Sequence, residues 1–463
     1  MKIICAKQAL LPEGWVSNVR VVVGDDGRIG QVGRAGFDIV TGNDIQEWHV
    51  ESLLPAPANA HSHAFQRAMA GLTEQRGPDP TDSFWTWRRL MYQFLDQLTP
   101  DDIEAIAAYA QMEMLEAGYA TNVEFHYLHN QPGGKPYDDI AELSARIAAA
   151  TATTGIALTL MPVHYQFGGC DQRDLNHAQR RFGTDLHAFA ELWLAARDTL
   201  HGLPADTCIG VAPHSMRAIA RENLPELLQL APEAPFHMHL AEQLAEVNEV
   251  EQHWGARPVQ WLMANAPVDQ RWCLIHCTQM TRAETRALAH SGAVAGLCPI
   301  TESSLGDGIF NGVEYLDAGG RLAIGSDSNI RISLSEELRT LEYSQRLRDH
   351  SRAALSTTKQ STGRRLYEQV VAGGAQAAGR HSGAIEIGRW ADLLALDGRH
   401  VDLDQLNGDT LLDTFIFAGD DRMVSEVWAA GRHQVTQGEH VNRCSIEQGY
   451  RLVMRKLRAF KNH

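Results

Sequence analysis

The feature that most constrains this fold is an alternation of short apolar segments with longer helix-like segments, starting near residue 52. Eight apolar segments have the length and composition of strands: 52–60, 122–127, 156–163, 208–213, 235–240, 272–276, 294–298 and 321–326. Between them lie stretches with helical patterns, among them 101–117, 138–152, 185–200, 244–265 and 335–349. Eight strands alternating with helices are typical of a (β/α)8 barrel.

A doubly wound open sheet is the alternative arrangement of alternating strands and helices. The dinucleotide-binding members of that class carry a GxGxxG motif after the first strand, and this sequence has none there. The first long helix has clear ends, because Thr99 is a suitable N-cap, Pro100 suits the first turn and Gly118 suits the stop. We therefore predict the α/β barrel.

Both ends of the chain differ from this pattern and indicate β structure. Residues 1–51 contain short β segments and turns. After the barrel, 388–397 is a turn leading into a strand, and 424–428 predicts another. The last segment, 446–460, is helical and basic at its end. The predicted parts are 1–51, a barrel over 52–380, and 381–463.

The charge and cysteine content exclude several classes of protein. Lys and Arg number 41 against 57 Asp and Glu, a formal charge of −16, which argues against binding nucleic acid or an anionic membrane. An anionic small substrate stays possible, because one or two local arginines decide that. We expect neither a signal peptide nor a membrane span. Seven scattered cysteines without a CxxC predict reduced thiols and a cytoplasmic location.

Histidines stand where two of the predicted strands end. His61 and His63 follow the first strand, and alternate residues of an extended segment point the same way. The fifth strand contains His237 and His239 and is followed by Glu242. Either histidine could bind a metal beside that acid, and the spacing does not decide between them.

Two further polar residues end the sixth and eighth strands, namely His276 and Asp327. Each alone has an ordinary explanation, such as a helix cap for Asp327. In a barrel, however, the carboxyl ends of all strands converge on one mouth. Three histidines and one aspartate suit zinc or a similar divalent metal with an open coordination position. Such a metal acidifies bound water, and Glu242 with the remaining imidazole would transfer protons.

Longer motifs resemble the amidohydrolase superfamily, namely PAPANAHSHAFQRAMAG, HMHLAE, GSDSN and ADLLALD. Within it, HSHAFQRAMAGLTE, FWTWRRLMY, EFHYLHN, APHSMR and LGDGIF resemble the formiminoglutamate deiminase family, over essentially the whole chain. The resemblance implies hydrolysis of N-formimino-L-glutamate to N-formyl-L-glutamate and ammonia in histidine degradation. It also implies that both chain ends form one small β-sandwich. One departure, PAPAN at 55–59 in place of PG(M/F)xN, affects only the packing of the first strand.

The resemblance also implies roles for particular residues. The zinc ligands would be His61, His63, His239 and Asp327. The catalytic residues would be Glu242 as the acid and His276 as the polarising histidine. As our own hypothesis, we expect Asp327 to be catalytic as well, as the acceptor of a proton from the attacking water. The substrate contacts would be Gln66, Tyr127, His214 and Arg217, together with Arg88 or Arg89 from the neighbouring subunit of a homodimer. The sequence does not choose between those last two arginines.

Formiminoglutamate has two carboxylates and a cationic amidine-like group, so its site needs positive anchors. Arg217 could bind one carboxylate with both arms of its guanidinium. A deaminase of a heterocyclic ring, the main alternative, would share the metal ligands but would not need such anchors. A scaffold that had lost catalysis would be expected to lack some ligands, and all are present here.

Overall fold

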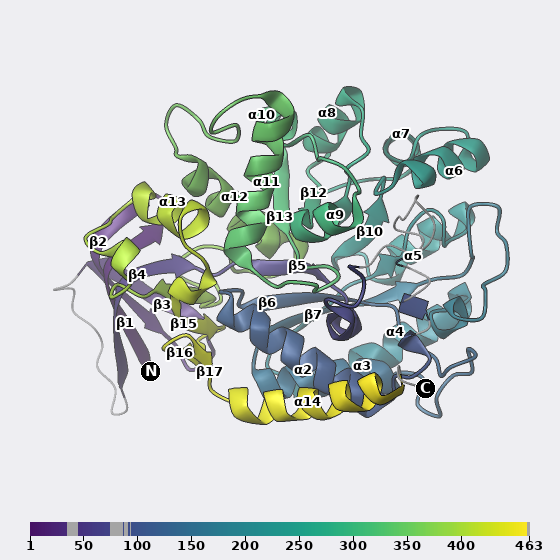
Figure 1. Ribbon diagram of the computed structural model, residues 1–463, viewed down its shortest axis with the longest axis horizontal. Helices are drawn as coiled ribbons and strands as arrows, with labels where there is room; N and C mark the ends of the chain where they lie inside the picture. Colours follow the sequence, from purple (N-terminus) through teal and green to yellow (C-terminus); the bar gives the residue numbers. More distant parts are fainter. Residues whose placement is uncertain (35–44, 75–86, 88–90, 93, 461–463) are drawn as a thin grey trace.

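The computed structural model describes residues 1–34, 45–74, 87, 91–92 and 94–460. A β unit made from both ends of the chain lies beside a larger α/β barrel, as Figure 1 shows. In the described part of the chain, no helix combines the length and apolar character that crossing a bilayer requires.

The barrel wall has eight positions and confirms the predicted (β/α)8 fold. Its strands are β5 (Ala58–Ser62), β6 (Thr121–His126), β7 (Ala157–His164), the pair β8 (Cys208–Ile209) and β9 (Ala212–Pro213), β10 (Phe236–Leu240), β11 (Trp272–His276), β12 (Val294–Leu297) and β13 (Arg321–Ile324). Parallel pairing runs from β5 to β8 and from β10 to β13. Two parallel bridges, Ser62 with Asp327 and Val211 with Phe236, join these two sheets into a closed wall.

Helices cover the outside of the wall. They are α2 (Pro100–Glu116), α3 (Glu142–Thr154), α4 (Leu186–Thr199), α5 (Leu224–Leu230), α6 (Leu244–Trp254), α7 (Pro258–Asn265), α8 (Arg282–Ser291), α9 (Pro299–Leu305), α10 (Gly312–Asp317), α11 (Leu334–Asp349) and α12 (Thr362–Ala377). Helix α2 begins as predicted, with a capping box between Thr99 and Asp102. The predicted helix 244–265 is two helices, because Gly255 takes a left-handed conformation and Pro258 starts a new helix.

The β unit is one hydrogen-bonded sheet built from both chain ends. Its strands are β1 (Lys2–Leu11), β2 (Gly14–Val23), β3 (Ile29–Arg34), β4 (Gln46–Pro55), β14 (Leu393–Leu396), β15 (Val424–Ala429), β16 (Arg432–Thr436) and β17 (Glu439–His440). They are ordered β17-β16-β15-β14-β4-β1-β2-β3. Antiparallel pairing of β14 with β4 therefore joins the two ends of the chain.

Alternation along β14 explains how the sheet joins the barrel. Leu393 and Ala395 belong to the core of the β unit, which β1, β2, β4 and β15 share. Leu394 and Leu396 face the other way and belong to the core that continues beneath the barrel helices. Successive strand residues point to opposite faces, so a strand with both faces buried has the continuous apolar sequence LLAL.

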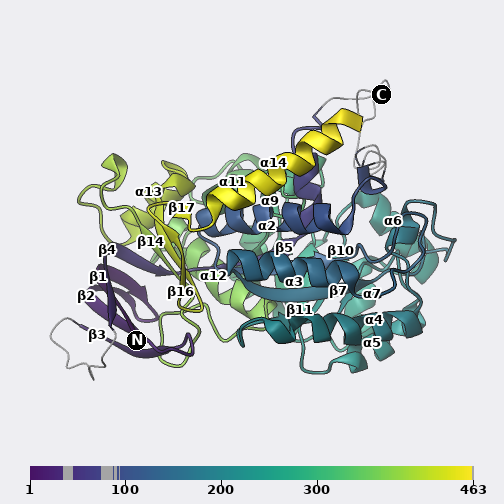
Figure 2. The ribbon, with the colours of Figure 1, turned by 90° about the horizontal axis from the view of Figure 1, so that it is seen from below.

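Two segments after β14 complete the fold, α13 (Asp409–Phe417) and the C-terminal α14 (Arg443–Phe460). Figure 2 shows α14 running along α2. The rings of Tyr109 and Tyr450 stack 4.0 Å apart between these helices, and Lys456 donates to Asp102 at 2.6 Å. The predicted basic C-terminal helix is present, and it packs on the barrel with one face.

The predicted strand 52–60 is wrong in one respect, because it is two strands in two different sheets. Strand β4 continues in the β unit to Pro55, beyond the expected boundary at residue 51, and β5 starts the barrel at Ala58. Pro57 has no amide hydrogen for a ladder, and it stands where the chain passes from one sheet to the other. The expected strand 208–213 is likewise split, into β8 and β9.

Candidate metal centre and active site

Four of the predicted side chains converge at the carboxyl ends of three barrel strands. His61 lies on β5, His63 directly follows that strand, His239 lies on β10 and Asp327 follows β13. All four are buried, and one ligand atom from each lies within 4.8 Å of the others. The Nε2 atoms of His61 and His239 are 3.0 Å apart. Asp327 Oδ1 is 3.2 Å from His63 Nε2 and 3.6 Å from His61 Nε2.

Hydrogen bonds on the far side of two rings prepare them to bind a cation. His63 Nδ1 donates to the Phe125 carbonyl and His239 Nδ1 donates to the His214 carbonyl, both at 3.0 Å. Each ring therefore has its lone pair on Nε2, facing the cluster centre. Burial holds the pKa of His61 and His239 well below the usual range, which keeps these rings neutral. Neutral imidazoles and a carboxylate are a donor set that fits a divalent metal.

The choice between His237 and His239, which the sequence left open, follows from their positions on β10. Both face the barrel interior, but His237 lies two residues nearer the amino end. Its Nε2 donates to the Ala377 carbonyl at 2.8 Å, at the end of α12. His239, and not His237, reaches the ligand cluster.

The backbone at the seam between β5 and β13 is shaped for this cluster. The pairing register of β5 shifts between Asn59 and Ser62, a bulge that redirects His61. Asp327 has a φ of 48°, which is uncommon for a residue with a side chain. A Cβ on Gly325 would lie 2.6 Å from the backbone nitrogen and oxygen of His61, so only glycine fits there.

Side-chain amides lock the same seam. Asn59 donates to Ser326 Oγ at 2.7 Å and accepts from the Ser326 amide at 2.9 Å. Asn329 donates to Ser62 Oγ and to the His63 carbonyl, both at 3.1 Å. The polar residues of the GSDSN motif therefore hold the two strands that provide three of the four cluster side chains.

Glu242 and His276 lie directly beside the cluster. His276 Nε2 is 3.8 Å from Glu242 Oε1 and 3.8 Å from Asp327 Oδ2. The turn that carries Glu242 is held by Glu246, whose carboxylate accepts from the amides of Ala241 and Glu242 at 3.2 and 3.0 Å. The rings of His239 and His276 are stacked 5.5 Å apart. Glu242 and His276 are therefore placed to exchange protons with a molecule bound at the cluster.

Burial affects this acid and this imidazole in opposite ways. Burial raises the pKa of Glu242, while His276 beside it acts to lower that pKa. Burial lowers the pKa of His276, but the carboxylates of Glu242, Glu302 and Asp327 outweigh burial and raise it well above its usual range. The pair of acid and imidazole is therefore suited to hold and pass a proton beside the metal ligands, as general acid catalysis requires.

A cavity of about 50 Å³ opens beside these residues, and the expected substrate contacts lie on its wall. Gln66, Tyr127, His214 and Arg217 all line it, together with His63, His239, Glu242, His276 and Asp327. Gln66 Nε2 donates to the Tyr127 hydroxyl at 2.7 Å. Arg88 and Arg89 lie outside the described residues. Trp87 and Met91, the nearest described residues on either side of them in sequence, also line this cavity.

The sequence interpretation assigned no role to several residues that the structure places here. Glu302 in α9 accepts from His276 Nδ1 at 3.2 Å. Thr301 and Leu305 of the same helix line the cavity, and Glu246 supports Glu242. An acidic residue shortly after the seventh predicted strand was a signal that could have pointed to Glu302.

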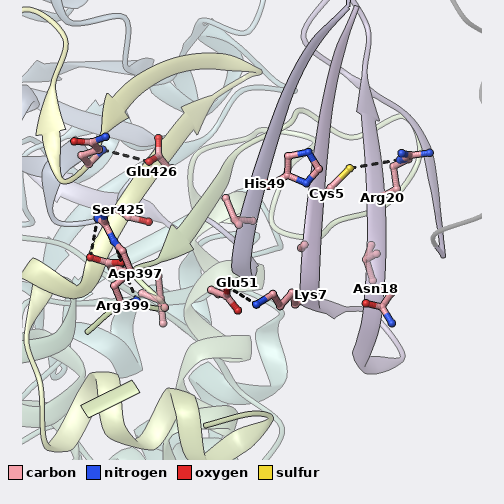
Figure 3. Close-up of a pocket in the computed structure, with 16 residues that line it drawn as sticks. Cys5, Lys7, Asn18, Arg20, His49, Glu51, Asp397, Arg399, Ser425 and Glu426 are labelled. Atoms are coloured by element: carbon pink, nitrogen blue, oxygen red, sulfur yellow. Dashed lines mark hydrogen bonds and ion pairs between the residues drawn. The ribbon is translucent and has the colours of Figure 1, made fainter. Parts of the chain in front are cut away.

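A larger cavity of about 570 Å³ lies in the β unit, between β1, β2 and β4 on one side and the C-terminal strands on the other (Figure 3). Cys5 and His49 face it, and with Glu47 they form a second cluster of possible metal ligands. The guanidinium of Arg20 donates to Cys5 Sγ at 3.5 Å, which places a positive charge where a cation would bind. Lys7 is paired with Glu51 at 2.6 Å. We therefore place the active site at the barrel mouth.

Known proteins are similar to this chain in sequence and in architecture. The model of the Amidohydrolase family matches residues 52–433, and that of the formimidoylglutamate deiminase HutF N-terminal domain matches residues 1–38. Formimidoylglutamate deiminase from Pseudomonas aeruginosa is 47% identical over 95% of this chain and 96% of that protein. Formimidoylglutamate and formiminoglutamate are two names for one compound.

Solved structures agree with this relationship. The crystal structure of an amidohydrolase from Brucella melitensis has a TM-score of 0.93 at 43% identity, covering 99% of this chain and 100% of that one. Atrazine chlorohydrolase from Arthrobacter aurescens, complexed with zinc, has a TM-score of 0.83 at 19% identity over 98% of this chain and 100% of that one, and shows only the shared fold. The chain belongs to the amidohydrolase family and, within it, to the formimidoylglutamate deiminases.

Proposed function

We propose that this chain hydrolyses N-formimino-L-glutamate to N-formyl-L-glutamate and ammonia, a step of histidine degradation. The main observation is that one cavity brings together the His and Asp cluster, the acid Glu242 and the buried guanidinium of Arg217. A substrate whose carboxylate pairs with Arg217 can present its C–N bond to the cluster. The kinship with the Pseudomonas enzyme supports the same reaction.

The metal that this site would hold is zinc, bound by His61, His63, His239 and Asp327. Three neutral imidazoles and one carboxylate are typical ligands of catalytic zinc. Zinc held there would acidify water and supply hydroxide near neutral pH. Glu242 and His276 are buried and lie beside these ligands, where they can reach a substrate that reacts at the cluster.

The protein residues then divide the proton transfers among them. Asp327 accepts the proton of the attacking water, and hydroxide adds to the formimino carbon. His276 donates a hydrogen bond from Nε2 to the added oxygen, and Glu242 protonates the imine nitrogen. The nitrogen then takes a second proton, the one held by Asp327, and the added hydroxyl returns its proton to Glu242. The C–N bond breaks as the carbonyl forms, and ammonia leaves. Positioned acid and base groups of this kind each contribute about 10²- to 10⁴-fold in rate.

The carboxylates of the substrate define the rest of the site. Arg217 binds one of them, and Tyr127, Gln66 and His214 line the same cavity as that guanidinium. Charge-assisted bonds from arginine to carboxylate are strong and directional. The net charge of −16 does not oppose this, because the local guanidinium decides the affinity.

Ammonia release from the purified protein tests the proposed activity. We expect rapid release from formiminoglutamate, slower release from formiminoaspartate, which is one methylene shorter, and none from guanine, cytosine or adenosine. Release from one of the ring substrates, with none from formiminoglutamate, would replace this proposal by that of a ring deaminase.

We expect His239→Ala to lose the bound metal and His237→Ala to retain it. The ring of His239 faces the cluster, whereas His237 is bonded to the Ala377 carbonyl. Metal content per chain, measured after purification in the presence of zinc, should fall from about one to well below one only in His239→Ala. The starting value of about one metal per chain corresponds to one ion bound by the four-ligand cluster. Loss of metal in His237→Ala, with metal retained in His239→Ala, would show that His237 and not His239 is the metal ligand.

A homodimer in the cytoplasm completes the proposal. All seven cysteines lie in the described part of the chain and each is a free thiol, which agrees with a reducing compartment. The second carboxylate anchor is Arg88 or Arg89, contributed by the neighbouring subunit.

We expect that only one of Arg88→Met and Arg89→Met loses activity with formiminoglutamate. If the active arginine crosses the dimer interface, mixing that variant with Arg217→Met should restore part of the activity after subunit exchange. One site of each mixed dimer then carries both changes and the other carries neither. Activity measured before and after exchange decides, and no recovery in demonstrably exchanged dimers would place that arginine in its own subunit's site.

A further inference from the structure

We propose that Glu302 is a positioning residue for this reaction. It holds the imidazole of His276 through Nδ1, so that Nε2 faces Glu242 and Asp327. This inference rests on the proposed function only for its kinetic consequence. The contact itself can be observed without substrate.

The geometry around Glu302 supports this role. One carboxylate oxygen, Oε1, accepts from His276 Nδ1 at 3.2 Å and from the Cys298 amide at 2.8 Å. Two donors from different parts of the chain therefore fix one buried acceptor. Helix α9 follows β12 directly, so Glu302 lies at the barrel mouth on the side of the neighbouring strand β11, which ends at His276.

His276 needs such a support because its backbone does not direct its ring by itself. Ile275 is buried among interior residues with Ala60 and Ala323, so strict alternation would turn the next side chain outward. His276 instead has a φ of 70°, a left-handed conformation, and its ring lies beside the cluster. Non-glycine residues hold such conformations only where surrounding contacts determine them.

The bond to Glu302 also determines which nitrogen of the His276 ring faces the cluster. With Nδ1 donating to Glu302, Nε2 is the nitrogen that points at Glu242 and Asp327, 3.8 Å from each. A ring turned by half a revolution would place a C–H group against the buried carboxylate and lose its hydrogen bond. Outer partners of this kind orient the histidines of metal sites, where their loss reduces metal affinity or activity by about 10- to 100-fold, and we expect a loss of that size in activity here.

A second buried glutamate separates this role from simple support of the helix. Glu337 of α11 accepts from the Ile300 amide at 2.9 Å, so it anchors the first turn of α9. It is also fully buried. A change at Glu337 therefore tests what loosening α9 does, without removing the bond to His276.

Three variants of the zinc-loaded enzyme test the kinetic part. We expect Glu302→Leu to lower kcat about 10- to 100-fold, with KM and metal content nearly unchanged, because it removes the acceptor that orients His276. Glu302→Gln keeps an acceptor oxygen and should recover most of that loss. Glu337→Leu, which removes the acceptor of the Ile300 amide, should lower thermal stability but leave the kcat of the folded enzyme nearly unchanged. Equal kcat losses in Glu337→Leu and Glu302→Leu would reduce Glu302 to a support of α9 and overturn the proposal.

Two further measurements show whether Glu302 acts through His276. In a His276→Asn background, adding Glu302→Leu should cause no further loss of kcat, whereas a full additional loss contradicts the proposal. Selective ¹⁵N labelling of histidines should reveal a protected Nδ1–H signal that His276→Asn and Glu302→Leu both remove. Persistence of that signal in Glu302→Leu would overturn the inference. If the Glu302→Leu variant loses the signal but the unmodified enzyme is inactive on formiminoglutamate, only the proposed reaction is rejected, and the contact between Glu302 and His276 stands.

Discussion

We expect the Glu242→Gln enzyme to keep its metal and its fold but to lose about 10²- to 10⁴-fold in turnover, the usual contribution of a positioned acid. Glutamine has nearly the same volume, so the buried space beside His276 stays filled. What disappears is an acid–base group, a carboxyl whose pKa burial raises. Without proton delivery from this carboxyl, the substrate nitrogen stays a poor leaving group.

Steady-state kinetics with a metal count on the same preparation measure this loss. Glu342→Gln is a matched control, because Glu342 is also fully buried but lies on α11, where it accepts from the amides of Ala354 and Leu355. It should reduce stability and leave the turnover of the folded enzyme unchanged. Near-normal turnover in Glu242→Gln would remove Glu242 from the proton transfer.

Local patterns predicted the fold well, because a (β/α)8 barrel consists of repeated local units. Each barrel strand is a short apolar segment, and helix α2 begins at the cap that its sequence specifies. The boundary between the β unit and the barrel was less accessible. The end of β4 and the start of β5 form one mostly apolar stretch, 52–60, and the division of this stretch between two sheets depends on the pairing of β4 with β14, more than 300 residues later.

The approximate location of the site was also predictable, since the carboxyl ends of barrel strands meet. The structure brings His61, His63, His239 and Asp327 together as this rule implies. The finer geometry was not available from spacing. The bulge in β5 and the left-handed backbone at His276 and Asp327 are set by tertiary contacts. The hydrophobic periodicity of the sequence carries no information on such contacts.

The same reason explains why the sequence did not predict the supporting residues Glu302 and Glu246. Glu302 and Glu246 act through bonds to other residues, and a glutamate on a helix usually has a solvent-exposed side chain. Only burial shows that these two differ from the many exposed acids of a chain with net charge −16. Their discovery therefore required the three-dimensional arrangement.

The substrate class depends on Arg217, and we expect Arg217→Met to lower kcat/KM for formiminoglutamate by some two to four decades while metal binding stays normal. The guanidinium is almost fully buried on the cavity wall. A carboxylate left there without its partner costs roughly 3–5 kcal/mol. At about 1.4 kcal/mol per tenfold change, that penalty corresponds to the expected loss.

A nearby arginine offers the control for this experiment. Arg221 is four residues further on, is about half exposed, and donates to the His253 carbonyl. Arg221→Met should leave the kinetics unchanged, because its charge is outside the cavity. A neutral ring substrate has no carboxylate to lose, so its hydrolysis would be nearly insensitive to Arg217→Met. Unchanged formiminoglutamate kinetics in that variant would therefore contradict the carboxylate anchor, and with it the preference for this substrate over a ring.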